Sequence, residues 1–237
     1  MAAQEFKGKL AIVTGGAKQN GIGFATACAL AKGGADIVLH YNLNKEAAQN
    51  SATKIRELGV KVAVVQGDAG SLSFGDDVVR ATLEAFPGRQ IDIIINNAGH
   101  ATFQEGTEAA VVEDFDALFH PNVRGPHLLV RAALPHIASP GGRIVNHERS
   151  LEYFDSGLGR RVGGEGITVN VVAPGPIATD YAPPEEHPLT KKFRAQQYIK
   201  RNGGAEEVAN VIVFAASSGA SFVSGQVLGV DGGLSYV

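Results

Sequence analysis

The sequence contains a single cysteine, Cys28, which excludes an internal disulfide framework and is typical of a reducing compartment. No apolar run approaches the roughly 18 residues that a membrane-spanning helix needs. The first residues, MAAQEFKGKL, lack the apolar core of a secretory signal. These absences predict a cytoplasmic protein that has no membrane partner.

Charge of one sign is also scarce, because the formal net charge is −3 and no long basic run occurs. Nucleic acid is therefore not an expected partner. The seven histidines are scattered without the spacing of metal ligands, so no metal site is expected. With 44% hydrophobic residues, the chain is typical of a folded protein, and its length suits one large α/β domain over residues 1–237.

Short apolar runs alternate with segments of helical periodicity along almost the whole chain. Most runs are continuous rather than alternating in polarity, as expected for parallel strands that are covered on both faces. The alternation predicts an α/β fold with a doubly wound, mostly parallel sheet of about seven strands. The runs are Leu10–Val13, Ile37–Leu39, Val62–Val65, Ile91–Ile95, Ile144–Val145, Ile167–Val172 and Val227–Val230.

Two helical segments carry further signals. In Lys45–Leu58 the apolar positions share one face, and Gly59 is a plausible C-terminal cap. A longer helical region over 111–137 contains Pro121 and Pro126, so a bend is expected within it.

The turn after the first apolar run is rich in glycine. Residues 14–23 read TGGAKQNGIG, and glycines at this point of a parallel sheet let the backbone approach a pyrophosphate that faces the next helix N-terminus. A plain tight turn is the alternative. After the second run, Tyr41 and Asn42 offer no acid for a ribose 2′-hydroxyl, while Lys18 is a nearby cation. This pattern favours NADP over NAD, unless Lys18 is merely solvated.

Further motifs follow the later runs in a characteristic order. They are NNAG at 96–99, PGPIAT at 174–179, and SGQV and VDGG at 224–227 and 230–233. With Asp68 after the third run and Asn122 in the long helical region, the sequence resembles the short-chain dehydrogenase/reductase family. The resemblance covers most of the chain. It implies a single Rossmann-type domain, NAD(P)-linked chemistry on a small-molecule carbonyl or alcohol substrate, and commonly a homodimer or homotetramer.

The resemblance also implies roles for individual residues. The first turn would hold the pyrophosphate, residues after the third strand the adenine, the NNAG segment the ribose region, and residues 174–179 the nicotinamide. With the 2′-phosphate residues, the expected cofactor-binding set is Gly15, Lys18, Gly21, Ile22, Gly23, Tyr41, Asn42, Asp68, Ala69, Asn97, Ala98, Gly99, Pro174, Gly175, Ile177 and Thr179. Asn122 would position a water in the proton relay, and a hydrogen bond at the helix kink beside Pro121 is the alternative.

The sequence departs from the family in the first turn and in the catalytic segment. Five residues separate Gly15 from Gly21, a longer loop that is similar to the enoyl-thioester reductase branch. Between Asn146 and Ile167 lie only 20 residues, and they contain no Tyr-x-x-x-Lys. In the family, the ammonium one helical turn from the phenol lowers the phenol's pKa from about 10, so that a proton moves near neutral pH.

In this chain other residues occupy the family's catalytic positions. Arg149 stands where the serine is expected, Val162 at the tyrosine position and Gly166 at the lysine position. The segment 156–164 has four glycines in nine residues, and each costs about 1 kcal/mol relative to alanine in a helix. The crossover helix should therefore be short or frayed, and an oligomer would lack part of its usual interface helix.

Substitute donors are available in the same segment. Tyr153 and Arg160 would share one face of a helix at a spacing that the enoyl reductase branch uses, and Arg160 could stabilise a tyrosinate. Ser150 offers another hydroxyl. The expected catalytic residues are thus Asn122, Ser150 and Tyr153, with an ordinary structural role for Tyr153 as the alternative.

Three interpretations of function remain open at the level of sequence. The chain could be an NADP-dependent reductase with an altered or impaired proton donor, a cofactor-binding pseudoenzyme, or a shortened product of a parent gene. Residues 180–200, which include three prolines, are expected to form a mobile lid over the substrate.

Overall fold

The computed structural model describes residues 4–101, 112–147 and 159–234. Its strands form one seven-stranded sheet in the order β3-β2-β1-β4-β5-β6-β7, and every neighbouring pair is parallel. The strands are β1 Leu10–Val13, β2 Asp36–Tyr41, β3 Val62–Gln66, β4 Ile93–Asn96, β5 Arg143–Asn146, β6 Thr168–Pro174 and β7 Val227–Val230. The expected doubly wound α/β fold is confirmed.

The central strands are buried along their length, which explains their continuous apolar runs. All residues of β1, β4 and β5 are buried, whereas the edge strands β3 and β7 are largely half-buried. The fourth strand is shorter than expected at its start. Ile91 forms only an isolated bridge to Ile137, and the pairing of β4 with β1 begins at Ile93.

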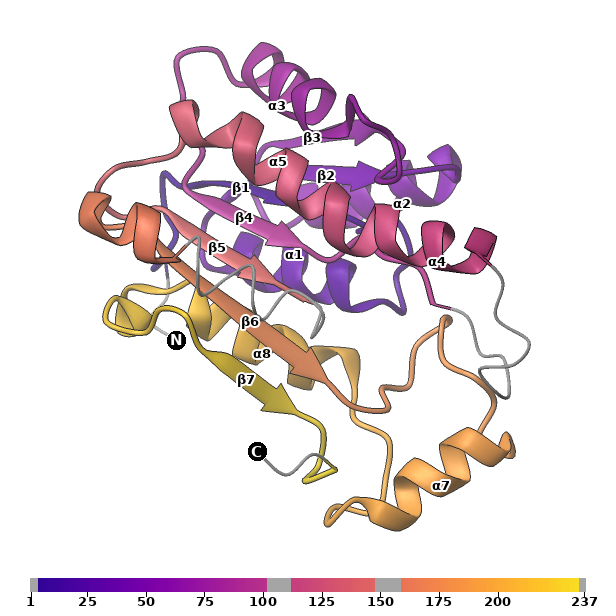
Figure 1. The fold of residues 1–237 in the computed structure, drawn as a ribbon. Coiled ribbons are helices and arrows are strands. Elements are labelled where there is room, and N and C mark those ends of the chain that lie inside the picture. Colours follow the sequence, from indigo (N-terminus) through magenta and orange to yellow (C-terminus); the bar gives the residue numbers. More distant parts are fainter. Residues whose placement is uncertain (1–3, 102–111, 148–158, 235–237) are drawn as a thin grey trace.

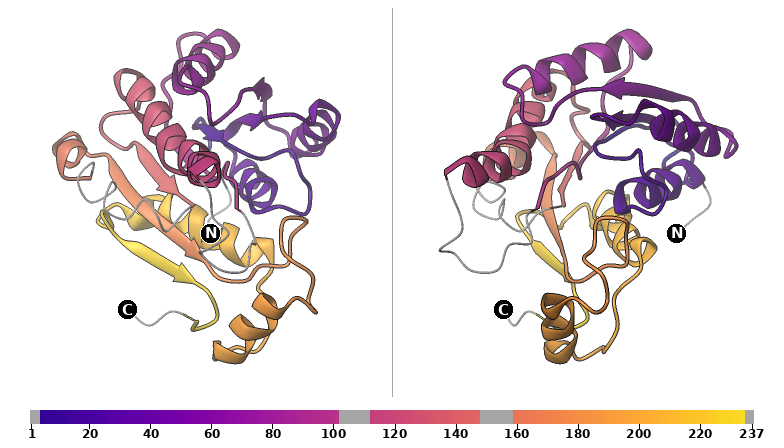
Figure 2. Two further views of the ribbon diagram at one scale, coloured as in Figure 1. Left: turned by 45° about the vertical axis from the view of Figure 1, so that its right-hand side comes forward. Right: turned by 90° about the vertical axis from the view of Figure 1, so that its right-hand side faces the viewer.

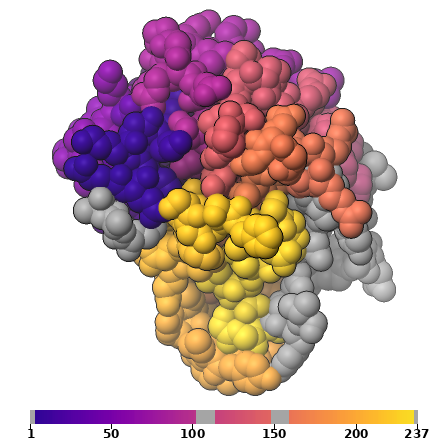
Figure 3. All heavy atoms as spheres, turned by 90° about the vertical axis from the view of Figure 1, so that its left-hand side faces the viewer, coloured from indigo at the N-terminus to yellow at the C-terminus, as the bar shows by residue number. Residues whose placement is uncertain are grey.

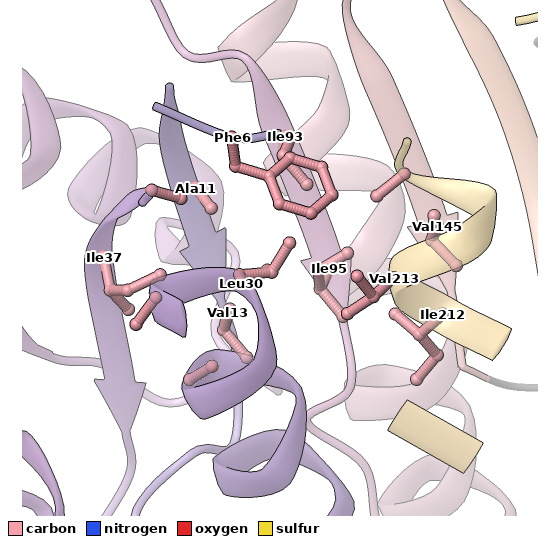
Figure 4. Packing of buried hydrophobic residues seen from close by; sticks show 14 of the residues in the cluster. Phe6, Ala11, Val13, Leu30, Ile37, Ile93, Ile95, Val145, Ile212 and Val213 are labelled. Carbon is pink, nitrogen blue, oxygen red and sulfur yellow. The ribbon is translucent and has the colours of Figure 1, made fainter. Parts of the chain in front are cut away.

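Helices cover both faces of the sheet (Figures 1 and 2). One face carries α1 Ile22–Lys32, α2 Lys45–Arg56 and α8 Ala205–Ala215, and the other carries α3 Phe74–Ala85 and α5 Gly125–Ala133. Each face has its own apolar cluster. In the first, Leu30 and Ile212 from two helices pack toward Val13 and Ile95 from the strands (Figure 4).

The long helical region is interrupted where the sequence places its prolines. α4 Val112–Phe119 leads into a π-helical turn, His120–Arg124, which contains Pro121 and passes directly into α5. The wider turn accommodates the missing proline N–H, so the expected disruption takes the form of a π turn. It places Asn122 close to the loop that follows β4.

The crossover from β5 to β6 has little helix among its described residues. A single helical turn spans 159–162, a 3-10 turn follows at Gly163–Glu165, and Gly166 ends it with a φ of +72°. Only a glycine adopts this left-handed conformation readily. The short or frayed crossover helix expected from the glycine content stays a prediction, because residues 148–158 lie outside the described part.

α7 Pro188–Gln196, in the expected lid, lies away from the two helical layers, beyond the carboxyl ends of β6 and β7 (Figures 1 and 2). On the opposite side, the N-terminal segment lies beside residues near 218, far away in the sequence (Figure 3). Glu5 Oε1 there accepts hydrogen bonds from Ser218 N and Oγ, each at 3.0 Å. Within the described ranges, no helix has both the length and the apolar character to cross a bilayer.

Candidate active site

Two glycines of the glycine-rich turn, Gly15 and Gly23, are packed too closely against their neighbours to be replaced by a larger residue. Gly15 has a φ of +68°, and a Cβ at Gly15 would lie 2.9 Å from Ala98 Cα. A Cβ at Gly23 would lie 2.5 Å from Asn97 Nδ2 and 2.7 Å from Gly15 O. The first turn of α1 therefore approaches the end of β1 directly, a contact that requires glycine at both positions.

The NNAG segment holds this turn in place. Thr14 Oγ1 accepts hydrogen bonds from Asn97 N and Ala98 N, both at 2.9 Å. Asn97 Nδ2 donates to Thr14 O at 2.8 Å and to Gly15 O at 3.2 Å. The two loops at the carboxyl ends of β1 and β4 are thus joined into one unit, and the Asn97 side chain is directed at the turn.

A buried histidine supports the same turn from β2. His40 Nδ1 lies 3.3 Å from Gly15 N, which donates to it, so Nε2 carries the proton and donates to Gly67 O at 3.0 Å. The ring stands edge-on to Phe74. Burial lowers the pKa of His40 from 6.5 to about 4, so the ring is neutral near pH 7. Sequence reasoning missed His40 because a polar residue within an apolar strand gives no sign of its partners.

The amino end of α1 has the features of an anion-binding helix terminus. Its N-cap is Gly21, no side chain caps it, and its first turn, which begins with Ile22, contains no acidic residue. The backbone N–H groups of the first turn have no partner within the helix, and the helix dipole favours negative charge there. This observation fits the pyrophosphate of a dinucleotide.

Lys18 is exposed, and both of its neighbours in the turn are hydrogen-bonded to α2. Ser51 Oγ on α2 donates to Ala17 O at 2.7 Å, and Lys54 on α2 donates to the side chain of Gln19. Because its two neighbours are tied to α2, Lys18 is held beside the helix that follows β2. The end of β2 itself provides a buried Tyr41 and an exposed Asn42.

The residues expected to meet the adenine follow β3. Asp68 Oδ1 accepts a hydrogen bond from Gly70 N at 2.9 Å, so its carboxylate shapes the loop, and Ala69 is buried. Both residues stand at the carboxyl edge of the sheet, as the first turn does.

A cavity of about 750 Å³ opens beyond the carboxyl ends of β6 and β7. The PGPIAT segment forms one wall through Pro174, Gly175, Ile177 and Thr179, and α7 contributes Leu189 and Phe193 among others. A Cβ at Gly175 would lie 2.7 Å from Asp231 Cα, so the PGPIAT and VDGG segments meet closely. Residues of α7 and the expected nicotinamide residues therefore line one space.

Asn122 binds the loop after β4 with both ends of its amide. Its Oδ1 accepts from His100 N at 2.7 Å, and its Nδ2 donates to His100 O at 2.6 Å. A Cβ at Gly99 would lie 2.8 Å from Asn122 Oδ1, which shows how closely the π turn approaches this loop. The side chain thus fixes the position of His100, and the water-relay role remains a prediction.

Tyr181, from the segment after β6, contacts the same loop. Its hydroxyl lies 2.7 Å from Ala101 N, which donates to it, and 3.1 Å from His100 Nδ1. Tyr181 also lines the cavity. A tyrosine of the lid segment and a histidine after the NNAG motif are therefore brought together by the fold, a pairing that no local sequence pattern signals.

The carboxyl end of β5 carries a second buried imidazole. Asn96 Nδ2 donates to Asn146 Oδ1 at 2.6 Å, and the next residue, His147, places its Nε2 where water does not reach it. Burial lowers the pKa of His147 to about 4. The other expected catalytic residues, Ser150 and Tyr153, lie outside the described residues, and Arg160 is exposed on the helical turn at 159–162.

Comparison with known proteins agrees with this geometry. Residues 9–148 match a family model described as short chain dehydrogenase, and residues 149–235 match one described as Enoyl-(Acyl carrier protein) reductase. The chain is 31% identical over 250 positions to the uncharacterized oxidoreductase YhxC of Bacillus subtilis (strain 168), with 98% of this chain and 86% of the relative covered.

Similarity extends to a fungal reductase and to a solved structure. Versicolorin reductase 1 of Aspergillus parasiticus is 32% identical over 257 positions, with 95% of this chain and 96% of the relative covered. A short chain dehydrogenase from Burkholderia cenocepacia J2315 in complex with NADP has a TM-score of 0.88 at 32% identity, with 97% and 99% of the two chains covered. The chain therefore belongs to the short-chain dehydrogenase/reductase family of oxidoreductases. The alignments with YhxC and with Versicolorin reductase 1 are longer than the 237 residues of this chain. Each of these two relatives therefore has residues without a counterpart in this chain.

Proposed function

We propose that this chain is an NADP-dependent oxidoreductase that interconverts a small carbonyl compound and its alcohol. The observation that carries the proposal is the backbone cradle formed by Gly15, Gly23 and the uncapped amino end of α1. This cradle fits a pyrophosphate, because close backbone approach and free N–H groups are what such a group needs.

The remaining cofactor contacts are proposed along the carboxyl edge of the sheet. Asp68 and Ala69 would meet the adenine, the 97–99 segment the ribose region, and residues 174–179 the nicotinamide carboxamide. When bound, the nicotinamide supplies or accepts a hydride. The protein's own task is then to orient a carbonyl group in the cavity under α7 and to deliver a proton to its oxygen.

Selectivity for the 2′-phosphate is proposed from the groups near the end of β2. Lys18 is held beside α2 by its neighbours, and the segment from Tyr41 to Asn44 contains no carboxylate that would bind a 2′-hydroxyl or repel a phosphate. The NADP-bound relative from Burkholderia cenocepacia supports this choice.

Cofactor choice can be tested by fluorescence titration of the protein with NADPH and NADH. NADPH should bind more tightly, and Lys18→Ala should narrow the difference because it removes the cation that faces the phosphate. Lys61→Ala, at an exposed lysine before β3, is the matched control and should leave the ratio unchanged. Equal affinities of the unaltered protein for the two cofactors would contradict the proposal.

A cofactor-binding protein without efficient chemistry is the second candidate. It is favoured by Arg149 at the serine position, by the missing Tyr-x-x-x-Lys, and by the unmatched residues of the relatives. A transcript that spans the codons of Asn146 to Ile167 would show whether a longer parent chain exists. Tight NADPH binding with no turnover of any carbonyl compound would favour this second candidate over the first.

A further inference from the structure

Tyr181 lines the cavity beyond β6 and β7, and its hydroxyl contacts the loop after β4. Tyr181 follows the PGPIAT segment, which is the proposed nicotinamide site, and its side chain lines the cavity under α7. The residue is 45% exposed. The hydroxyl also contacts the loop after β4, because Ala101 N donates to it.

Two nitrogen atoms converge on this hydroxyl. Ala101 N donates to it at 2.7 Å, and His100 Nδ1 lies 3.1 Å from it. When Nδ1 carries a proton, both nitrogens donate to the oxygen and stabilise it as a phenolate. The hydroxyl proton is directed at Ala101 O, which at 3.4 Å is a weak acceptor that a substrate oxygen could replace.

We propose that Tyr181 is the proton donor of this chain and that His100 reloads it, in place of the missing tyrosine and lysine of the crossover helix. The inference rests on the proposed reductase function. In the reduction, the carbonyl carbon takes the hydride that bound NADPH supplies, and the carbonyl oxygen takes the Tyr181 proton. The product is an alcohol with oxidised cofactor. The phenolate regains a proton from Nδ1 of the imidazolium form of His100, and the neutral ring that results takes up a proton from solvent.

Asn122 is the positioning residue of this arrangement. Its two hydrogen bonds to the His100 backbone, at 2.7 and 2.6 Å, fix the loop that carries both nitrogen donors. The imidazole of His100 takes the role that the lysine ammonium has in the family's Tyr-x-x-x-Lys pair. It stabilises the phenolate and exchanges a proton with solvent.

The contact itself can be tested without cofactor. Isotope-labelled tyrosine Cζ resonances are recorded by NMR for the unaltered protein, and the Tyr181 signal is assigned by its loss in Tyr181→Phe. His100→Asn should move that signal, because the ring nitrogen next to the phenol oxygen is replaced by a neutral amide. His136→Asn, at an exposed histidine near the opposite edge of the sheet, should leave it in place. An unchanged Tyr181 Cζ chemical shift in His100→Asn would overturn the pairing of Tyr181 with His100.

The catalytic role is tested with NADPH and ethyl benzoylformate, an activated ketone, as the probe. Tyr181→Phe should lower kcat at least about a hundredfold, the lower range for a positioned general acid, and leave the NADPH dissociation constant within twofold. His100→Asn should lower kcat by a smaller factor. Tyr198→Phe makes the same chemical change at a tyrosine outside the cavity and should retain full activity.

The possible outcomes separate this inference from the proposed function. Full kcat in Tyr181→Phe would overturn the donor role and leave the reductase function standing. An unaltered protein that binds NADPH but does not reduce the ketone would overturn the donor role and favour the cofactor-binding candidate. An unaltered protein that fails to bind NADPH would overturn both.

Discussion

At the scale of single residues, His40 links the phosphate turn to the interior of the protein. Its neutral ring accepts from Gly15 N and donates to Gly67 O, and both contacts need the same tautomer. Protonation of Nδ1 would replace the acceptor by a second donor facing Gly15 N–H. The turn that is proposed to bind the cofactor therefore depends on His40 remaining uncharged.

His40 should make the protein lose stability in mild acid. Its pKa falls from 6.5 to about 4 on folding, so between these values the unfolded chain binds more protons than the folded one. Its contribution is present above pH 6.5 and is lost as the pH falls toward 4, up to about 3 kcal/mol over the whole window.

Urea unfolding at pH 7 and pH 5 measures this loss of stability. His40→Gln should reduce the difference between the two free energies of unfolding, although His147, whose pKa is lowered in the same way, keeps part of it. His136→Asn is the control at an exposed histidine, and it should preserve the full difference. An unchanged pH dependence in His40→Gln would show that His40 does not carry the effect.

At the scale of elements, the packing of α1 against the loop after β4 leaves no room for a methyl group. Gly23→Ala would place its Cβ 2.5 Å from Asn97 Nδ2 and 2.7 Å from Gly15 O. We expect a loss of about 1–3 kcal/mol in the free energy of unfolding, together with weaker NADPH binding. Urea unfolding and fluorescence titration measure the two effects.

The matched control for Gly23→Ala is Gly164→Ala. A Cβ at Gly164 meets nothing within 4 Å, so this variant should be neutral or slightly stabilising. If Gly23→Ala were as stable and as tight a binder as Gly164→Ala, the close approach of α1 to the NNAG segment would be disproved.

The crossover between β5 and β6 should be the least protected part of the described fold. Its helical turn at 159–162 is short, and glycines weaken it on both sides. Hydrogen exchange should therefore be fast over 159–164 and slow in β4 and β6, whose residues are buried in the sheet. Exchange over 159–164 as slow as in β4 would mean that this segment is stabilised by contacts other than its own helix.

Elements were predicted from the sequence better than contacts between them. Continuous apolar runs located every strand to within a few residues, because burial on both faces leaves a strong local signal. The glycine-rich turn was also evident, since positive φ angles and close approaches demand glycine. By contrast, the contacts of His40 with Gly67 and of Tyr181 with His100 join residues far apart in the chain. Only the folded sheet brings these partners together, so neither contact could be read from spacing.

At the scale of the whole molecule, we expect the fold to accept a proton donor from either of two segments that follow neighbouring strands. The family's donor comes from the crossover helix after β5, whereas Tyr181 comes from the segment after β6. Both segments leave the carboxyl edge of the sheet, and both could face a carbonyl oxygen beside the proposed nicotinamide site. A tyrosine on the crossover helix should therefore be able to replace Tyr181 as the proton donor.

Interchange can be tested by a graft in a donor-deficient background. A longer segment that carries Tyr-x-x-x-Lys is inserted between Arg149 and Gly159 of the Tyr181→Phe variant. Because a positioned general acid typically contributes 10²–10⁴-fold, the graft should raise kcat for ethyl benzoylformate by about a hundredfold or more. The same graft with the new tyrosine replaced by phenylalanine is the control for folding and for cofactor affinity.

In the protein with Tyr181 intact, the increase in kcat caused by the graft should be much smaller, because Tyr181 already supplies the proton. A large gain in that background, equal to the gain in Tyr181→Phe, would show that Tyr181 contributes nothing and that the missing segment alone limits the reaction.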